Sequence, residues 1–142
     1  MDYSYLIIPI IVGITSQVLK LLTDGIKGNF DLKNLYETYG GFPSSHTAFA
    51  VSIATLIGLR QNLSSPIFAV AFVFSFLIVR DALGFRNFLG KQGKILNHLI
   101  NKLPKEERKN MPRFRERMGH NAIEVLGGVI LGVGLTYFLN LI

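Results

Sequence analysis

The chain has 142 residues, of which 49% are hydrophobic and only 17% are charged, and its mean hydropathy is +0.38. This balance is too apolar for a typical water-soluble domain and predicts a single bilayer-embedded domain, residues 1–142. The absence of cysteine excludes disulfides, zinc–thiolate sites and thiol nucleophiles. The net charge of +6 is concentrated in residues 80–117, where eleven Lys or Arg stand against four Asp or Glu. A basic segment between apolar ones favours anionic lipid headgroups over nucleic acid as the partner.

The first apolar run, residues 5–22, is long enough to cross a bilayer if Lys20 reaches the interface. It follows Met1-Asp2-Tyr3, which lacks the basic segment of a cleavable signal, so we expect the run to stay in the mature protein. Residues 23–39 are mixed in charge and predict a connecting loop, with one short helical turn near residues 32–36.

Residues 40–48, with the sequence GGFPSSHTA, predict a loop that opens into a helix. Two glycines give backbone freedom, a proline fixes the approach, and Ser44 and Ser45 offer N-cap oxygens. The unpaired N–H groups of such a helix start can hold a phosphate, and His46 in the first turn can give or take a proton. An ordinary capped helix with a surface histidine is the alternative interpretation. The helix is expected to end near residue 59, which is short for a membrane span.

Three more helices are expected. Residues 67–79 are almost purely apolar, and residues 85–103 carry apolar side chains on one face, which is typical of an amphipathic helix lying on a membrane surface. Pro104 ends that helix, and residues 121–142 form the last apolar run. The small-residue face of this run permits close approach of another helix, from the same chain or from a second copy in a homodimer, through Gly127, Gly128, Gly132 and Gly134. The expected fold class is all-α: an integral membrane bundle of about four transmembrane helices, plus an amphipathic interfacial helix between helices three and four.

The positive-inside rule assigns residues 80–117 to the cytoplasm, together with the loop before the second helix. Ionisable residues at the helix ends then fall at one membrane face: Lys20, His46, Asp81, Arg86, His120 and Glu124. We therefore expect a protein of the cell (inner) membrane whose site faces the cytoplasm. His98, on the amphipathic helix, is not expected to take part.

A histidine and a carboxylate in the last helix have the spacing of a catalytic pair. His120 and Glu124 are four residues apart, so the carboxylate can accept a hydrogen bond from the imidazole and leave the other ring nitrogen as a nucleophile. His46 would then protonate a departing alkoxide. The cationic side chains of Lys20 and Arg86 would neutralise a phosphoryl group. The backbone N–H groups of Ser44 and Ser45 would do so as well. Simpler interpretations are a helix-surface pair at His120, a snorkelling Lys20 and an Asp81–Arg86 ion pair.

Three stretches together resemble the motifs of the divergent type 2 phosphatidic acid phosphatase family, which is related to acid phosphatases and vanadium-dependent haloperoxidases. They are residues 40–48, the DALGFR sequence of residues 81–86, and Gly119-His120 followed by Glu124-Val125 and Gly128. The resemblance covers essentially the whole chain. It implies that Pro43-Ser44-Ser45-His46 matches a P-S-G-H motif, with His46 as general acid. It also implies His120 as the phosphate-attacking nucleophile and Glu124 as its orienting carboxylate.

The chain also departs from the wider superfamily at two arginines. Lys20 matches the lysine of a K-x6-R-P motif, but Lys27-Gly28 stand where arginine and proline are usual, and Phe114 stands at the arginine of the third motif. We expect Arg86 to supply the missing guanidinium. Asp81, Gly41 and Gly119 are expected to support the site.

The resulting hypothesis is a phosphatase without metal or other cofactor that hydrolyses a lipid phosphomonoester or diphosphate through a phosphohistidine on His120. The resemblance implies phosphatidylglycerophosphate, phosphatidic acid and polyprenyl diphosphate as candidate substrates. The expected partners are this substrate and membrane lipids, not nucleic acid. Two alternatives stay open: a non-catalytic membrane protein that binds anionic headgroups or partner proteins, and a metal site formed by His46, His120, Glu124 and Asp81.

Overall fold

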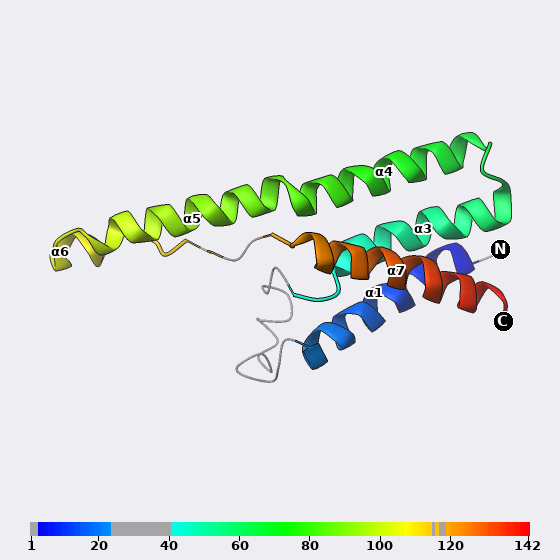
Figure 1. The fold of residues 1–142 in the computed structure, drawn as a ribbon, viewed down its shortest axis with the longest axis horizontal. Helices are drawn as coiled ribbons and strands as arrows, with labels where there is room; N and C mark the ends of the chain where they lie inside the picture. Colours follow the sequence, from blue (N-terminus) through cyan, green and yellow to red (C-terminus); the bar gives the residue numbers. More distant parts are fainter. Residues whose placement is uncertain (1–2, 24–40, 115, 117–118) are drawn as a thin grey trace.

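The regular elements of the computed structural model are all α-helices within the residues that it describes, 3–23, 41–114, 116 and 119–142. The all-α fold class is therefore confirmed, and each predicted helix is present. The turn predicted near residues 32–36 lies outside the described residues. In chain order the helices are α1 (Ser4–Thr23), α3 (Ser45–Gln61), α4 (Pro66–Leu83), α5 (Phe85–Asn101), α6 (Lys105–Arg108) and α7 (Ala122–Asn140) (Figure 1).

Helix α3 is the centre of the bundle and packs against α1, α4 and α7 (Figure 1). Its fully buried Leu56 packs with Ile8 and Val12 of α1. On another side, Ala54 of α3 packs with Ala71 of α4. Small side chains at such contacts let helix backbones approach closely, which is the main source of helix association in lipid.

The glycines of α7 make the closest of these contacts. A Cβ at Gly128 would lie 2.5 Å from the carbonyl oxygen of Ser44, and one at Gly132 would lie 2.7 Å from that of Ala48. At Gly134, by contrast, a Cβ would meet nothing within 4 Å. Gly128 and Gly132 therefore serve packing within the chain, and a homodimer through α7 stays a prediction.

Polar side chains also join the helices. Thr136 of α7 donates to Ser52 of α3 over 2.6 Å, and Ser75 of α4 donates to the carbonyl oxygen of Ala50 over 2.7 Å. All of these residues are buried, so the hydrogen bonds satisfy groups that have no access to water.

Arg60 connects three helices at the end of the bundle where α1 begins and α7 ends (Figure 1). Its Nε donates to Asn140 Oδ1 over 2.6 Å, and its Nη1 donates to Ser4 Oγ. The guanidinium also lies over the Tyr5 ring, 5.4 Å from the centroid. The ends of α1, α3 and α7 are thereby held together.

Three segments of the described chain are long and apolar enough to cross a membrane: α1, residues 66–101 and α7. Large apolar side chains on these helices face outward, as at Val70, Phe76 and Ile130, whose side chains are exposed. Lipid is the environment in which such an arrangement is stable. Helix α3, with 17 residues, is not among the three, in keeping with its predicted shortness. The protein is therefore an integral membrane helical bundle.

Helix α5 continues along the direction of α4 and extends away from the bundle (Figure 1). The helical hydrogen bonds run through the junction, because Gly84 N–H donates to Arg80 over 2.8 Å and Phe88 N–H donates to Gly84 over 2.9 Å. The 36 residues of the two helices extend about 54 Å, against a hydrocarbon core of about 30 Å. The interfacial position of α5 stays a prediction, and it requires a bend at Gly84.

Candidate active site

His120 lies just before α7 and is held from both backbone and side chain. Its N–H donates to the carbonyl oxygen of Ala82 over 3.2 Å, and its Nδ1 lies 2.8 Å from Glu124 Oε2. Because an ionised carboxylate only accepts, this contact requires the ring proton on Nδ1 and leaves a lone pair on Nε2. The side chain keeps only 8% of its surface exposed. The predicted contact between His120 and Glu124 is therefore present.

Asn121 fixes the carboxylate and begins the helix. Its side-chain oxygen accepts from Glu124 N–H over 2.8 Å, and its own N–H donates to Glu124 Oε2 over 3.4 Å, which together form a capping box. Its amide nitrogen also donates to Glu124 Oε1 over 3.1 Å. The sequence analysis missed this residue, although an N-cap residue followed three positions later by Glu, ahead of an apolar run, is the recognisable signal.

The pKa of His120 lies below the usual 6.5, chiefly because burial disfavours the charged ring. The hydrogen bond and negative charge of Glu124 act in the opposite direction but do not cancel this effect. The positive charges of Lys20 and Arg86 lower the pKa further. The neutral ring, with a lone pair on Nε2, is thus the favoured state near neutral pH.

Helix α5 positions the segment that leads to His120. Asn97 donates to the carbonyl oxygen of Phe114 over 2.7 Å and accepts from Phe114 N–H over 2.9 Å. It also donates to Glu116 over 2.9 Å. Closer to the site, a Cβ at Gly119 would lie 2.5 Å from the backbone nitrogen and Cα of Asn87. Only glycine fits there, and the supporting role of Gly119 at the site stays a prediction.

The start of α3 differs in part from the prediction. Ser44 is fully buried, and its N–H, expected to face a phosphate, donates instead to the carbonyl oxygen of Glu124 over 2.9 Å. Its hydroxyl donates to Thr47 over 3.0 Å and does not cap the helix. Ser44 therefore joins α3 to α7. The prediction missed this hydrogen bond because its acceptor lies in α7, where no local sequence pattern reveals it. Gly41 has a φ of 101°, which favours glycine.

Ser45 stands at the first position of α3 and is only half-buried. Its hydroxyl accepts a hydrogen bond of 3.1 Å from Ser16 of α1. This bond holds the end of α1 that carries Lys20 close to the start of α3. The placement of Ser45 leaves its predicted phosphate-binding role as a prediction.

His46 is exposed in the first turn of α3, and four other ionisable groups act on its ring electrostatically. These are Arg86, His120, Lys20 and Asp81. They come from the end of α1, the α4–α5 junction and the start of α7. The structure therefore brings the two predicted catalytic histidines and the two predicted cations to one end of the bundle. Their individual roles stay predictions.

Asp81 pairs with Arg86, as the simpler interpretation of the sequence had it. Arg86 Nε lies 2.5 Å from Asp81 Oδ2, and both side chains are partly exposed. The pairing orients the guanidinium, whose charge acts on both histidine rings. Lys27 and Gly28, which stand at the superfamily's Arg-Pro position, lie outside the described residues.

The alternative metal site has no geometric support. Within the part of the chain that the structure describes, no three His, Asp or Glu side chains come together closely enough to hold a metal ion. All four proposed ligands, His46, His120, Glu124 and Asp81, belong to that part.

The fold and the site thus define the class of protein. It is an all-helical integral membrane protein that gathers two histidines and two cations at one end of its bundle. The chain belongs to the Divergent PAP2 family, whose model matches residues 1–135. It is similar to the uncharacterized membrane protein YuiD of Bacillus subtilis (strain 168), with 32% identity over 117 residues, 75% of this chain and 74% of that protein. No solved structure matches the chain. The family resemblance inferred from the three motifs is confirmed.

Proposed function

We propose that this protein is a phosphatase of the cell membrane that removes phosphate from a lipid phosphomonoester or diphosphate at the cytoplasmic face. The observation that carries the proposal is the buried His120–Glu124 contact of 2.8 Å, with the charges of Lys20 and Arg86 acting on the same ring. Membership of the Divergent PAP2 family supports a phosphatase-related role.

In the proposed first step, Nε2 of neutral His120 attacks the phosphorus atom. A P–N bond forms while the P–O bond to the lipid leaving group breaks, and His46 gives its proton to the departing oxygen. In the second step His46 takes a proton from water, whose oxygen attacks the phosphorus. The P–N bond then breaks, which releases inorganic phosphate and restores His120.

Glu124 and Asp81 would act through other side chains. Glu124 holds the proton on Nδ1 of His120 and stabilises the positive charge that this ring gains as the P–N bond forms. Asp81 orients Arg86 by its contact with Nε. Lys20 and Arg86 would then stabilise the charge that spreads over the phosphoryl oxygens.

The charges around His46 are suited to a proton donor whose ring becomes protonated when the substrate binds. Desolvation is the main cause that lowers the pKa of His46; the charges of Arg86, His120 and Lys20 lower it further, and that of Asp81 raises it. An anionic phosphate between the two cations would offset their repulsion, so binding of substrate is expected to favour the protonated, proton-donating form of His46.

The cytoplasmic orientation is supported by charge. Residues 80–117 begin in the last turn of α4, at the end of the bundle that carries the site, and they hold the excess of Lys and Arg that marks cytoplasmic segments. A lipid substrate would present its phosphate at this depth while its chains stay in the bilayer. Phosphatidylglycerophosphate, phosphatidic acid and polyprenyl diphosphate are the candidates to be compared first.

The decisive experiment measures phosphate release from these three lipids by purified protein in detergent, with a chelator present. We expect release by the wild type and loss in His120→Ala and His46→Ala. His98→Ala is the matched control, because His98 is exposed on α5 and should be dispensable. Wild-type protein should also form an acid-labile phosphoprotein that is missing from His120→Ala.

Other outcomes would identify a different function. No release by the wild type from any of the lipids, together with retained binding of their headgroups, would support a non-catalytic binding protein instead. Loss of release with chelator, restored by a divalent ion, would support a metal-dependent reaction.

A further inference from the structure

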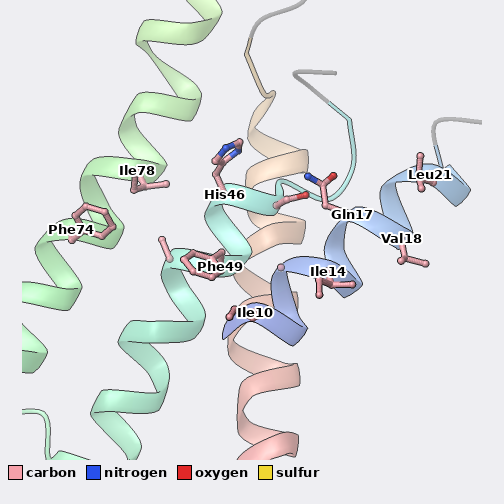
Figure 2. A pocket seen from close by; sticks show the side chains of 12 residues that line it. Ile10, Ile14, Gln17, Val18, Leu21, His46, Phe49, Phe74 and Ile78 are labelled. Atoms are coloured by element: carbon pink, nitrogen blue, oxygen red, sulfur yellow. The ribbon is translucent and has the colours of Figure 1, made fainter. Parts of the chain in front are cut away.

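An apolar groove of about 630 Å³ begins at His46 and runs between α1 and α4 across the surface of α3 (Figure 2). Figure 2 shows His46 and Gln17 toward one end of the groove and Ile10 toward the other. Apart from Gln17, Ser45 and His46, the lining is apolar or glycine. The polar groups are thus confined to the end that carries the proposed catalytic site.

The depth of the groove matches one leaflet of a bilayer. Along α1 it extends from Leu21 to Ile10, which at 1.5 Å per residue is about 16 Å. Half of a hydrocarbon core of about 30 Å is about 15 Å. A chain that descends from a headgroup at the level of His46 would therefore reach the bilayer midplane near Ile10.

The groove also opens sideways toward lipid. Ile14 on the α1 side is 60% exposed, and Phe74 on the α4 side is 55% exposed. Both α1 and α4 pack on α3, and the groove separates them there. A lipid chain could therefore enter from the bilayer without first leaving it.

We propose that this groove holds one hydrocarbon chain of the lipid phosphate while its phosphate lies at His46 and His120. The inference rests on the proposed function and adds the part of the protein that recognises the lipid chain. Charge complementarity identifies the occupant. The charges of Lys20 and Arg86 act on His46 at one end, and none of the other lining residues is ionisable, which is the polarity of a molecule with an anionic head and a hydrocarbon tail.

A second apolar groove, of about 530 Å³ between α3, α4 and α7, lacks this feature. None of the residues that line it is ionisable, and neither histidine belongs to it. The second groove gives an internal comparison. A lipid chain that bound only because a groove is apolar would occupy the first and the second groove alike.

Gly13 and Phe49 determine the width of the first groove. A Cβ at Gly13 would lie 3.3 Å from Cδ2 of the Phe49 ring, so the absence of a side chain on α1 leaves the space beside this ring open. A larger side chain at residue 13 would project into the groove. Phe49 is itself on the groove wall and partly exposed, which lets its ring yield without disturbing the core.

The test compares Gly13→Leu with Gly134→Leu, which makes the same change on α7 where a Cβ meets nothing within 4 Å. Dipalmitoyl phosphatidic acid and glycerol 3-phosphate serve as substrates with and without chains. In Gly13→Leu we expect the KM for the lipid to rise about tenfold and kcat/KM for glycerol 3-phosphate to change less than about twofold. Gly134→Leu should resemble the wild type with both. Equal KM values for the lipid in the two variants would overturn the proposal.

Phe49→Ala tests the same groove by widening it, so that no steric block to folding is introduced. We expect it to accept phytanoyl phosphatidic acid better than the wild type does, by about fivefold in kcat/KM relative to the palmitoyl lipid. An unchanged ratio would contradict the assignment.

Photolabelling separates failure of the groove from failure of the proposed function. A phosphatidic acid with a diazirine on its palmitoyl chain should label residues 10–18 and residue 74 in the wild type, and much less in Gly13→Leu. Labelling of Phe72 and Val133 in the second groove to the same extent would refute the groove assignment. Absence of phosphate release from every lipid, with labelling confined to the first groove, would refute the phosphatase and leave the lipid site standing.

Discussion

Gly128→Ala tests the contact that joins α3 to α7. A Cβ at this position would lie 2.5 Å from the carbonyl oxygen of Ser44 and 3.0 Å from Thr47 Cβ. Since a carbon atom normally stays about 3.3 Å from such an oxygen, the two helices would have to separate by roughly 0.8 Å. Overpacking of this kind costs about 1–3 kcal/mol, which exceeds the gain of about 0.5–1 kcal/mol from replacing a helical glycine by alanine.

Gly134→Ala is the matched control, because the same Cβ there enters open space. It should gain the helix-propensity benefit without the clash. Because this benefit is common to both variants, we expect their free energies of unfolding to differ by the overpacking cost of about 1–3 kcal/mol, or roughly 3–9 °C in Tm, with Gly128→Ala the less stable. Thermal melts of both in one detergent, followed by circular dichroism, measure this. Equal melting temperatures would show that the backbones of α3 and α7 do not approach as described.

The same variant links packing to the site. The hydrogen bond from Ser44 N–H to the Glu124 carbonyl oxygen, 2.9 Å long, lies at this contact. Separating the helices would therefore move His46 away from His120. A displacement near 1 Å costs about 100-fold in well-oriented reactions, so phosphate release by folded Gly128→Ala should fall by about 10- to 100-fold. Full activity in a folded variant would contradict a site shared between α3 and α7.

Three further outcomes are expected. Burial lowers the pKa of His120 below the 6.5 of the unfolded chain, so the unfolded state binds more protons as the pH falls past that value. Stability should therefore be full above pH 6.5 and decrease as the pH falls below that value, and melts of His120→Gln should show a weaker dependence. Glu124→Gln should reduce phosphate release about 10- to 100-fold and move the acidic limb of the pH–rate profile to lower pH, since Glu124 raises the pKa of His120. Asn97→Ala should lower kcat by about tenfold through loss of both hydrogen bonds to Phe114, and an unchanged kcat would show that α5 does not position His120.

Hydropathy was sufficient to predict α1 and α7, because an uninterrupted apolar run of membrane length has few alternatives to a helix. The boundaries of α1 and α3 agree with the prediction to within about two residues. The junction of α4 and α5 was less predictable. Gly84 and the charged residues before it indicate a break, but the backbone hydrogen bonds continue through them. A glycine permits a helix to end and does not require it.

The pair formed by His120 and Glu124 was predictable because both residues belong to one helical turn, where spacing determines contact. Contacts between segments that are distant in the sequence were not predictable in this way. The acceptor for Ser44 N–H is the carbonyl oxygen of Glu124 in α7, eighty residues further along the chain. The N–H group that was expected to bind phosphate is therefore used to pack α3 against α7. The contact of Asn97 with Phe114 likewise joins residues 17 positions apart, and it depends on how the linker folds back along α5.

The contacts of Arg60 with Asn140 and Ser4 have a consequence for how the protein can be studied and how it can move. They hold the far ends of α1, α3 and α7 together, so a separation of these three helices has to begin at the histidine end. They also keep the start of α1 and the end of α7 together, at the end of the bundle opposite the candidate site (Figure 1). Reporter domains fused to either terminus should therefore give the same topology signal, and neither should obstruct the candidate site.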